Sequence, residues 1–327
     1  MILILSTSYD TDSQLVLDWL KHYNANFVRL NDEDLMTGKT IIEFNPQNIE
    51  SNFIINNGIK ILLSEITVVW FRKFGFLHTY ENVFGRSNDL TRYLYTEFSI
   101  LRTLFLKSLD KKKWLNKRIN MPSKFEVLTT AYNCGLVTPQ TIITNNKKNL
   151  TNTFQEKSII SKSLNESKHI KMNDQTFSFF TTFIETLKDI QLDTFTPSLF
   201  QEYIDKKYEL RIFYLDGKFY SMAIFSQMNE KTKIDFRNYD MEYPNRRIPY
   251  KLPKEIEKKL DKMMQVLGLN TGSIDMILTK KDEYVFLEVN PSGQFGMTSL
   301  PCNYNLHKKV AEKLIEFNNE RQSGGVS

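Results

Sequence analysis

A hairpin close to the C-terminal end constrains the fold more than any other part of the sequence. Residues 273–279 and 284–289 each have the composition of a β-strand, and a polar turn separates them. Side chains alternate between the two faces of a strand, so one face of this hairpin is predicted to be wholly apolar and to belong to a core. Ile277 and Phe286 fall on the opposite face. The predicted core face consists of Ile274, Met276, Leu278, Val285, Leu287 and Val289.

The opposite face of the hairpin also carries two acids. With the turn centred on residues 281–282, Asp275 lies directly opposite Glu288, and Asn290 lies two residues further along the same face. Two carboxylates about 5 Å apart repel each other by roughly 3 kcal/mol at an effective dielectric of about 20, and a hard cation removes that cost. Two carboxylates and an amide oxygen suit Mg²⁺. We therefore predict a magnesium site at Asp275, Glu288 and Asn290, in preference to a solvated face on which the acids point into water.

Three further charged residues interrupt apolar strands. The dipeptide Asp216-Gly217 predicts a second hairpin, which places Glu209 and Arg211 on one face of its first strand. Taken alone, this pair is equally consistent with an ordinary salt bridge. Lys162 stands in a third apolar strand, where its charge needs a partner or an anion, and phosphate is one such anion.

The order of predicted elements changes along the chain. Residues 1 to about 115 alternate strands with amphipathic helices, of which the longest covers residues 89–109. This alternation predicts an open, largely parallel α/β sheet. The following two hundred residues contain runs of strands with few helices, which predicts an α+β region. The overall fold class is therefore α/β followed by α+β.

Composition excludes several classes of protein. The chain has 327 residues, only 12 glycines and a net charge of +5, which is too small a positive charge for a dedicated nucleic-acid binder. No apolar run approaches the roughly 20 residues that span a membrane, and the apolar start is expected to be a strand and not a signal peptide. Two cysteines exclude a disulfide framework, and we expect a cytoplasmic protein. The sequence contains no G-x-G-x-x-G, H-E-x-x-H, C-x-x-C or G-x-S-x-G motif.

Taken in order, these pieces resemble the ATP-grasp superfamily over about residues 116–295. The resemblance implies an ATP-grasp fold with an N-terminal open α/β pre-grasp domain at 1–115, a small subdomain at 116–204 and a C-terminal subdomain with the metal site at 205–321. It implies Mg²⁺ at Asp275, Glu288 and Asn290, and Arg211 and Arg237 as catalytic residues near the transferred phosphoryl group. The residues that it implies for ATP are Lys124, Lys162, Gln201, Glu202, Tyr203, Ile204 and Glu209. Residues 165–169 lack the family's glycine-rich phosphate loop.

A closer similarity is to the graspetide maturases (microviridin-type and grasp-with-spasm enzymes). It rests on Val69-Trp70-Phe71-Arg72-Lys73, on Asp235-Phe236-Arg237, and on the run from Phe286 to Gln294. It implies an ATP-dependent macrocyclase that phosphorylates Asp or Glu side chains of a ribosomal precursor peptide and joins them to Thr or Ser as ω-esters, or to Lys as ω-amides. The peptide would have a leader and an acidic, Thr-rich core, and a homodimer stays open. By analogy, Arg72 and Lys73 receive the acidic peptide, and a helix containing Glu185 and Asp189 docks the leader.

Two other functions remain open at this level. One is an ATP-grasp ligase that adds an amino acid to a small molecule or to a protein C-terminus. The other is a non-catalytic ATP-binding regulator, against which the complete metal triad and Arg211 argue. The Trp70–Lys73 and Pro-Ser-Gly-Gln signatures favour the peptide macrocyclase over the amino-acid ligase.

Overall fold

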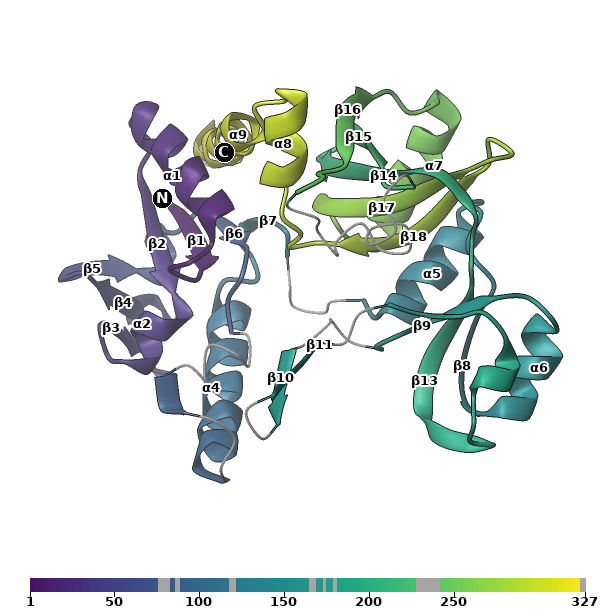
Figure 1. Cartoon of the computed structure of the whole chain (residues 1–327). Helices are drawn as coiled ribbons and strands as arrows, with labels where there is room; N and C mark the ends of the chain where they lie inside the picture. The colour runs from purple at the N-terminus through teal and green to yellow at the C-terminus, as the bar shows by residue number, and fades with distance from the viewer. Residues whose placement is uncertain are drawn as a thin grey trace. The chain divides into compact units, whose positions relative to one another are not determined.

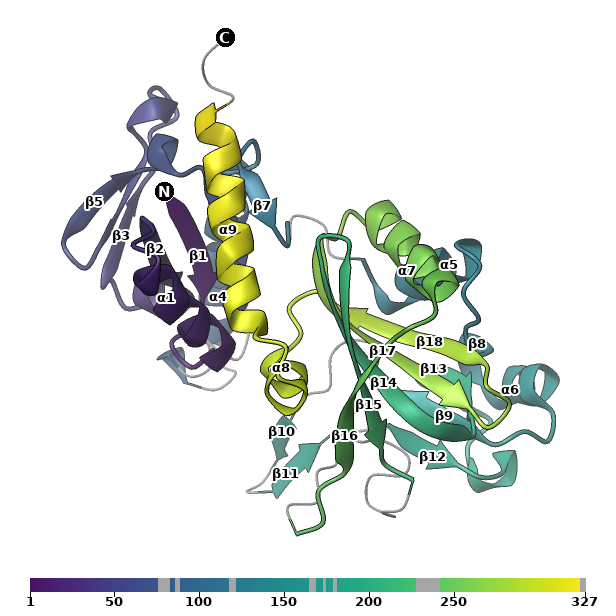
Figure 2. The same ribbon diagram turned by 90° about the horizontal axis from the view of Figure 1, so that it is seen from above.

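The computed structural model describes residues 1–75, 83–85, 89–117, 122–164, 169–172, 175–178, 181–227 and 242–323. Arg237, with its neighbours Asp235 and Phe236, lies outside the described residues, as do residues 165–168. The chain divides into two compact units, both drawn in Figures 1 and 2. The first unit comprises residues 1–121, 268–272 and 291–327, and the second comprises 122–267 and 273–290.

The first unit is built on a parallel sheet with the strand order β2-β1-β6-β7. This confirms the predicted open α/β arrangement. Its strands are β1 (Ile2–Ser6), β2 (Phe27–Asn31), β6 (Val68–Phe71) and β7 (Lys113–Leu115). Its helices are α1 (Thr11–His22), α2 (Asp32–Met36), α4 (Asp89–Ser108), α8 (Gly296–Cys302) and α9 (Leu306–Ser323).

The long helix α9 is packed with the N-terminal elements. It contacts α1, β1, β6 and β7, and Figure 2 shows it in yellow alongside α1 and β1. This arrangement differs from the expectation that residues 205–321 form one subdomain. The reason is that the chain returns to the first unit at Pro291, and apolar residues of α9 such as Leu314 are buried there.

A small antiparallel sheet completes the first unit and was not predicted from the sequence. Its strands, in the order β3-β4-β5, are β3 (Thr40–Glu43), β4 (Phe53–Asn56) and β5 (Ile59–Leu62). The short 3-10 helices Ile49–Ser51 and Leu63–Glu65 flank β4 and β5. Buried residues of both sheets and of α4, including Leu5, Ile54 and Phe105, form one apolar core.

The second unit contains two larger antiparallel sheets. The first has the order β12-β9-β13-β8, with β8 (Thr141–Asn146), β9 (Ile159–Lys162), β12 (Thr182–Ile184) and β13 (Thr194–Glu202). The second has the order β16-β15-β14-β17-β18, with β14 (Lys206–Leu215), β15 (Lys218–Phe225), β16 (Arg246–Tyr250), β17 (Thr271–Thr279) and β18 (Tyr284–Asn290). Strands β10 (His169–Met172) and β11 (Gln175–Ser178) form a separate ribbon.

Local sequence explains the boundaries of several elements in the second unit. The helices are α5 (Lys124–Asn133), α6 (Lys147–Phe154) and α7 (Lys254–Val266). Ser123 caps α5 in a capping box with Glu126, and Gly135 ends the helical turn with a φ of 79°. Asp216 and Gly217 both have positive φ, as a two-residue hairpin turn requires, so the predicted hairpin is confirmed. Across the described parts of the chain, every helix is too short or too polar to cross a bilayer.

Candidate functional site

A cavity is lined by residues from both large sheets of the second unit. Strands β9 and β13 contribute one group of lining residues, and β14, β17 and β18 contribute the other. The lining includes many of the residues that the sequence nominated for nucleotide and metal. They are Lys162, Gln201, Glu202, Tyr203, Ile204, Glu209, Asp275 and Glu288.

The segment Gln201–Ile204 covers the end of β13 and the start of the connection to β14. Hydrogen bonds to neighbouring segments fix its conformation. Gln201 is 2% exposed, pairs with Ile160 in the β9–β13 ladder, and donates from Nε2 to Thr141 Oγ1 over 3.0 Å. The backbone N–H of Tyr203 donates to Ser158 O over 3.0 Å. This segment is therefore an ordered edge of the cavity.

The side chain of Glu202, at the end of β13, is engaged by neighbouring groups of the second unit. Its carboxylate accepts a hydrogen bond of 2.9 Å from the backbone N–H of Gln140 and lies 3.0 Å from Lys157 Nζ. The ring of Tyr203 packs edge-on against Phe183 at 4.9 Å between centroids. Both side chains are thus engaged by other groups of the second unit.

The two lysines that the sequence nominated for phosphate, Lys124 and Lys162, lie near each other in the fold. Lys162 ends β9, and Lys124 begins α5. The ammonium of Lys124 donates to Ser163 O over 2.9 Å, one residue beyond Lys162. Of these two lysines, Lys162 lines the cavity.

A buried ion pair between Lys206 and Glu209 lies at the start of β14. Both side chains are almost fully buried, and both residues line the cavity. A buried ammonium needs such a partner. Sequence reasoning missed Lys206 because residues three apart on a strand are expected on opposite faces, so the alternation pattern carried no signal for this pair.

A second buried ion pair joins Arg211 of β14 to Asp275 of β17. Arg211 Nη1 lies 2.7 Å from each of the two carboxylate oxygens of Asp275. The two strands are neighbours in the sheet. The sequence nominated Arg211 for the phosphoryl group and Asp275 for the metal, but nothing in the pattern predicted that β14 and β17 would be adjacent.

The predicted register of the carboxylate hairpin is confirmed at its functional end. Asp275 pairs with Glu288, and Ser273 pairs with Asn290. A β-bulge then makes Leu287 an extra residue on β18, so Met276 pairs with Phe286 and Ile277 with Val285.

The bulge corrects the predicted division of faces in β18. Phe286 pairs with Met276 and is fully buried, so it belongs to the core face. Val285 pairs with Ile277 and lies on the other face. Beyond the bulge, every residue moves to the opposite side because strand side chains have a period of two. Leu287 itself lines the cavity beside Glu288.

The oxygen donors at this end of the hairpin fit a hard divalent cation. Asp275 and Glu288 face each other across the ladder, and Asn290 lies two residues along β18. Arg211 carries part of the counter-charge that the sequence argument assigned to a metal. In the part of the chain that the structure describes, no three or more His, Cys, Asp or Glu residues are grouped so as to hold a metal. Metal binding here would therefore use the Asn290 amide or groups of a bound ligand.

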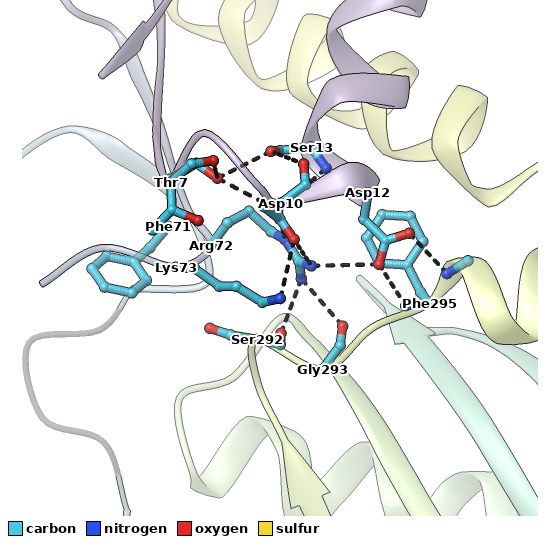
Figure 3. A network of polar contacts seen from close by, with 12 residues as sticks. Thr7, Asp10, Asp12, Ser13, Phe71, Arg72, Lys73, Ser292, Gly293 and Phe295 are labelled. Carbon is cyan, nitrogen blue, oxygen red and sulfur yellow. Dashed lines mark hydrogen bonds and ion pairs between the residues drawn. The ribbon is translucent and has the colours of Figure 1, made fainter. Parts of the chain in front are cut away.

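Arg72, which the sequence nominated for the peptide, lies in a buried network of the first unit, shown in Figure 3. Its side chain is 3% exposed, with Nε 3.2 Å from Asp10 and Nη2 3.5 Å from Asp12. Its Nη1 donates to Ser292 O and Gly293 O, each over 3.2 Å. The guanidinium is thus fully engaged by the chain's own groups.

The neighbouring charges in this network depend on one another. Lys73 is 24% exposed, and its ammonium lies 3.4 Å from Asp10. Burial disfavours the charged form of Asp10, but the charges and hydrogen bonds of Arg72 and Lys73 outweigh this and lower the pKa of its carboxyl to about 2. Burial likewise opposes ionisation of Asp12, yet bonds from His307 and the charge of Arg72 lower its pKa.

Residues around Glu185 and Asp189 do not form the expected leader-docking helix. Strand β12 ends at Ile184, and only the 3-10 turn Leu187–Asp189 follows. The carboxylate of Asp189 accepts from the backbone N–H of Thr186 over 3.3 Å, so it caps this turn. Glu185 is exposed, and its carbonyl accepts from Ser158 Oγ.

Comparisons with known proteins match two family models, one after the other along the chain. Residues 1–121 match the family model described as the MvdD pre-ATP grasp domain, and residues 129–314 match the RimK-like ATP-grasp domain. A comparison with curated proteins finds no match.

Solved structures resemble the whole chain. Macrocyclase MdnC from Microcystis aeruginosa MRC, bound with precursor peptide MdnA, is 27% identical with a TM-score of 0.81, covering 97% of this chain and 99% of that chain. A RiPP-associated ATP-grasp ligase from Chryseobacterium gregarium, in complex with ADP and a leader and core peptide, is 23% identical with a TM-score of 0.81, covering 96% of each chain. ATP-grasp ligase PsnB, complexed with a precursor variant, Mg and ADP, is 16% identical with a TM-score of 0.74, covering 97% of this chain and 98% of that chain.

Proposed function

The chain belongs to the RimK-like ATP-grasp family, and on that basis we propose that it is an ATP-dependent ligase that closes rings in a ribosomally made precursor peptide. The observation that carries the peptide assignment is the combination of an MvdD-type pre-ATP grasp domain with this ligase domain in one chain. Full-length similarity to macrocyclase MdnC, which was solved with its precursor peptide, supports it.

The cavity of the second unit is the proposed ATP site. The ATP-grasp fold binds ATP. Here the backbone of Gln201–Ile204 would meet the adenine, Glu209 the ribose, and Lys162 and Lys124 the phosphates. Asp275, Glu288 and Asn290 would hold Mg²⁺, which when bound neutralises charge on phosphate oxygens. The lining of the cavity by the connecting segment, Lys162 and both carboxylates supports this assignment.

The proposed reaction has two steps. In the first, a carboxylate oxygen of an Asp or Glu side chain of the peptide attacks the γ-phosphorus of ATP, and the bond from that phosphorus to the bridging oxygen breaks, releasing ADP. In the second, a Thr or Ser hydroxyl, or a Lys amine, attacks the resulting acyl phosphate. The bond from the acyl carbon to the phosphate oxygen breaks, phosphate leaves, and the attacking group loses its proton.

Arg211 and Arg237 are the proposed catalytic cations. Each would stabilise negative charge that develops on the phosphoryl or carbonyl oxygens. Arg211 is held by its ion pair with Asp275, which lines the cavity. If Mg²⁺ also bound Asp275, more of the positive charge of Arg211 would be available to the substrate. We assign no general base.

The proposed partner is a precursor peptide with a leader and an acidic, Thr-rich core. A cytoplasmic location is part of the proposal, and both cysteines are free and buried, as a reducing compartment allows. Of the residues expected to bind the peptide, Lys73 is partly exposed, and Glu185 and Asp189 are exposed.

Co-expression with a candidate precursor peptide, sought among short acidic, Thr-rich reading frames beside the gene, tests the proposal. Each ring expels one water, so the intact mass of the peptide should fall in steps of about 18 Da with one ATP used per ring. Mild base should reverse ω-ester losses and leave ω-amide losses unchanged. An unchanged peptide mass would contradict the macrocyclase. A gain equal to an amino acid would replace it with the amino-acid ligase.

A further inference from the structure

Both strands of the carboxylate hairpin are continuous with the first unit. Residues 268–272 of the first unit lead into β17, and β18 leads directly into Pro291, where the chain re-enters that unit. The ladder pair Ser273–Asn290 therefore lies where the two strands join the first unit. Contacts that fix residues 268–272 and Pro291 therefore also restrain the Ser273–Asn290 pair, because these residues are covalently joined to it.

The segment 291–296 is held almost residue by residue by three side chains of the first unit. Asn116 Nδ2 donates to Pro291 O and Ser292 Oγ, each over 3.1 Å. Arg72 Nη1 donates to the carbonyls of Ser292 and Gly293. Asp12 accepts from the backbone N–H groups of Phe295 and Gly296, each over 3.0 Å. Figure 3 shows the Arg72 and Asp12 parts of this arrangement, which we call the 291–296 clamp.

Gly296 shows how closely the clamp is packed. A Cβ atom added there would lie 2.6 Å from Asp12 Oδ1, which also lies 2.9 Å from His307 Nε2. No side chain larger than a hydrogen fits at this position without displacing the carboxylate. The segment therefore has one well-defined path.

Asn116 is the member of the clamp that reaches both strands. Its backbone N–H donates to Asn270 Oδ1 over 2.9 Å, in the segment before β17, and its amide holds Pro291 and Ser292 after β18. The same amide donates to Phe71 O at the end of β6 over 3.0 Å. Asn116 is 1% exposed and has a φ of 61°, a left-handed conformation that asparagine tolerates better than most residues.

The position of Asn290 makes this restraint useful. Because Asn290 precedes Pro291, its backbone is confined to extended conformations. With Pro291 O fixed by Asn116, the end of β18 has little remaining freedom. A metal site holds its ion better when the supporting groups fix the ligands before the ion arrives.

We propose that Asn116 is a positioning residue for the metal end of the hairpin. By tying Asn270 and Pro291–Ser292 to the end of β6, it fixes the Ser273–Asn290 pair, so that Asn290 and Glu288 bind the cation without reorganising. This inference rests on the proposed function, since it takes Mg²⁺ to be held by Asp275, Glu288 and Asn290. It assigns a role in metal affinity to a residue that does not itself contact the cavity.

Titration of Mg²⁺ into the full-length protein saturated with ADP tests this role in Asn116→Gly. Glycine keeps the left-handed backbone and the N–H to Asn270 but removes the amide. The matched control is Asn24→Gly, an exposed asparagine of the first unit with a φ of 51°. We expect Asn116→Gly to raise the Mg²⁺ concentration at half-maximal stabilisation about tenfold. The stabilisation by ADP without Mg²⁺ should match that of the wild type and of Asn24→Gly.

Two results would overturn the inference. One is the same half-maximal Mg²⁺ concentration in Asn116→Gly and Asn24→Gly. The other is an equal loss of the ADP and Mg²⁺ responses, which a merely structural residue would give. If Asn116→Gly does not fold, Asn116→Asp keeps the size and backbone preference, replaces the donors with an acceptor, and undergoes the same titration. A wild-type protein without any response to ADP and Mg²⁺ would instead overturn the proposed function itself.

Discussion

One guanidinium nitrogen of Arg211, Nη1, lies 2.7 Å from both carboxylate oxygens of Asp275 in a buried ion pair beside the candidate metal site. Removing one partner of a buried pair leaves an uncompensated charge and costs about 3–5 kcal/mol. If the candidate site holds a cation, the carboxylate of Asp275 would have two counter-charges, the arginine and that cation.

Arg211→Met should lower the free energy of unfolding by about 3 kcal/mol, because Asp275 is left buried without its arginine. Mg²⁺ with ADP should recover more stability in this variant than in the wild type, since the cation then supplies the missing charge. Denaturant unfolding with and without Mg²⁺ measures both effects. The control is Lys207→Met, on the same strand as Arg211. This variant breaks the exposed ion pair between Lys207 and Asp282 and should cost at most about 1 kcal/mol. Equal costs for the two variants would contradict the prediction.

Glu288→Gln and Asn290→Ala should each abolish ATP turnover and leave the fold intact. Both residues offer oxygen donors at the proposed metal site of the hairpin, and neither is in the core. Phosphate release measures turnover, and thermal unfolding checks the fold. Glu283→Gln removes an exposed acid near the turn of the same hairpin and should turn over normally. Near-normal magnesium-dependent turnover in either test variant would remove that residue from the metal site.

Lys162→Ala should weaken nucleotide binding. A ligand at a hundredfold excess over its dissociation constant stabilises the folded state by about 2.7 kcal/mol, and this increment should shrink markedly without the lysine that lines the cavity. Melting with and without ADP measures the increment. Lys148→Ala removes an exposed lysine of α6 and should keep the full increment. An unchanged increment in Lys162→Ala would make Lys162 a structural lysine.

The stability of the first unit should fall in acid because of Asp10. The pKa of this carboxyl is lowered from 3.8 to about 2 in the folded state, so its ionised form contributes stability above pH 4. That contribution, about 2 kcal/mol, is lost as the pH falls from about 4 to 2. Asp10→Asn should be less stable at pH 6 and should lose less stability across this range. Parallel stability curves for the two proteins would contradict the assignment.

Alternation and turn chemistry were sufficient to predict the functional end of the hairpin. They set Asp275 opposite Glu288, because a two-residue period and a turn together determine a register. They could not predict the bulge at Leu287, since an apolar residue inserted between apolar neighbours leaves no trace in the pattern. The faces of Val285 and Phe286 were therefore wrong.

Tertiary packing explains the other differences. Arg72 follows a strand in sequence, where a cation is expected to be accessible, but segment 291–296 from the far end of the chain covers it. Phe183 and Leu187 have helical spacing, yet β12 pairs with β9 and ends before Glu185. No sequence pattern indicated the roles of Lys206 and Asn116, because the fold of the chain determines which groups they contact.

The first unit draws its covering helix from the last part of the chain, and this has a practical consequence for dissecting the protein. A fragment that stops at residue 121 would lack α9, so β1, β6 and β7 would expose the apolar surface that this helix covers. Such a fragment should aggregate when expressed alone. Binding studies on the isolated first unit would need residues 291–323 supplied in the same polypeptide, joined by a linker in place of the excised second unit.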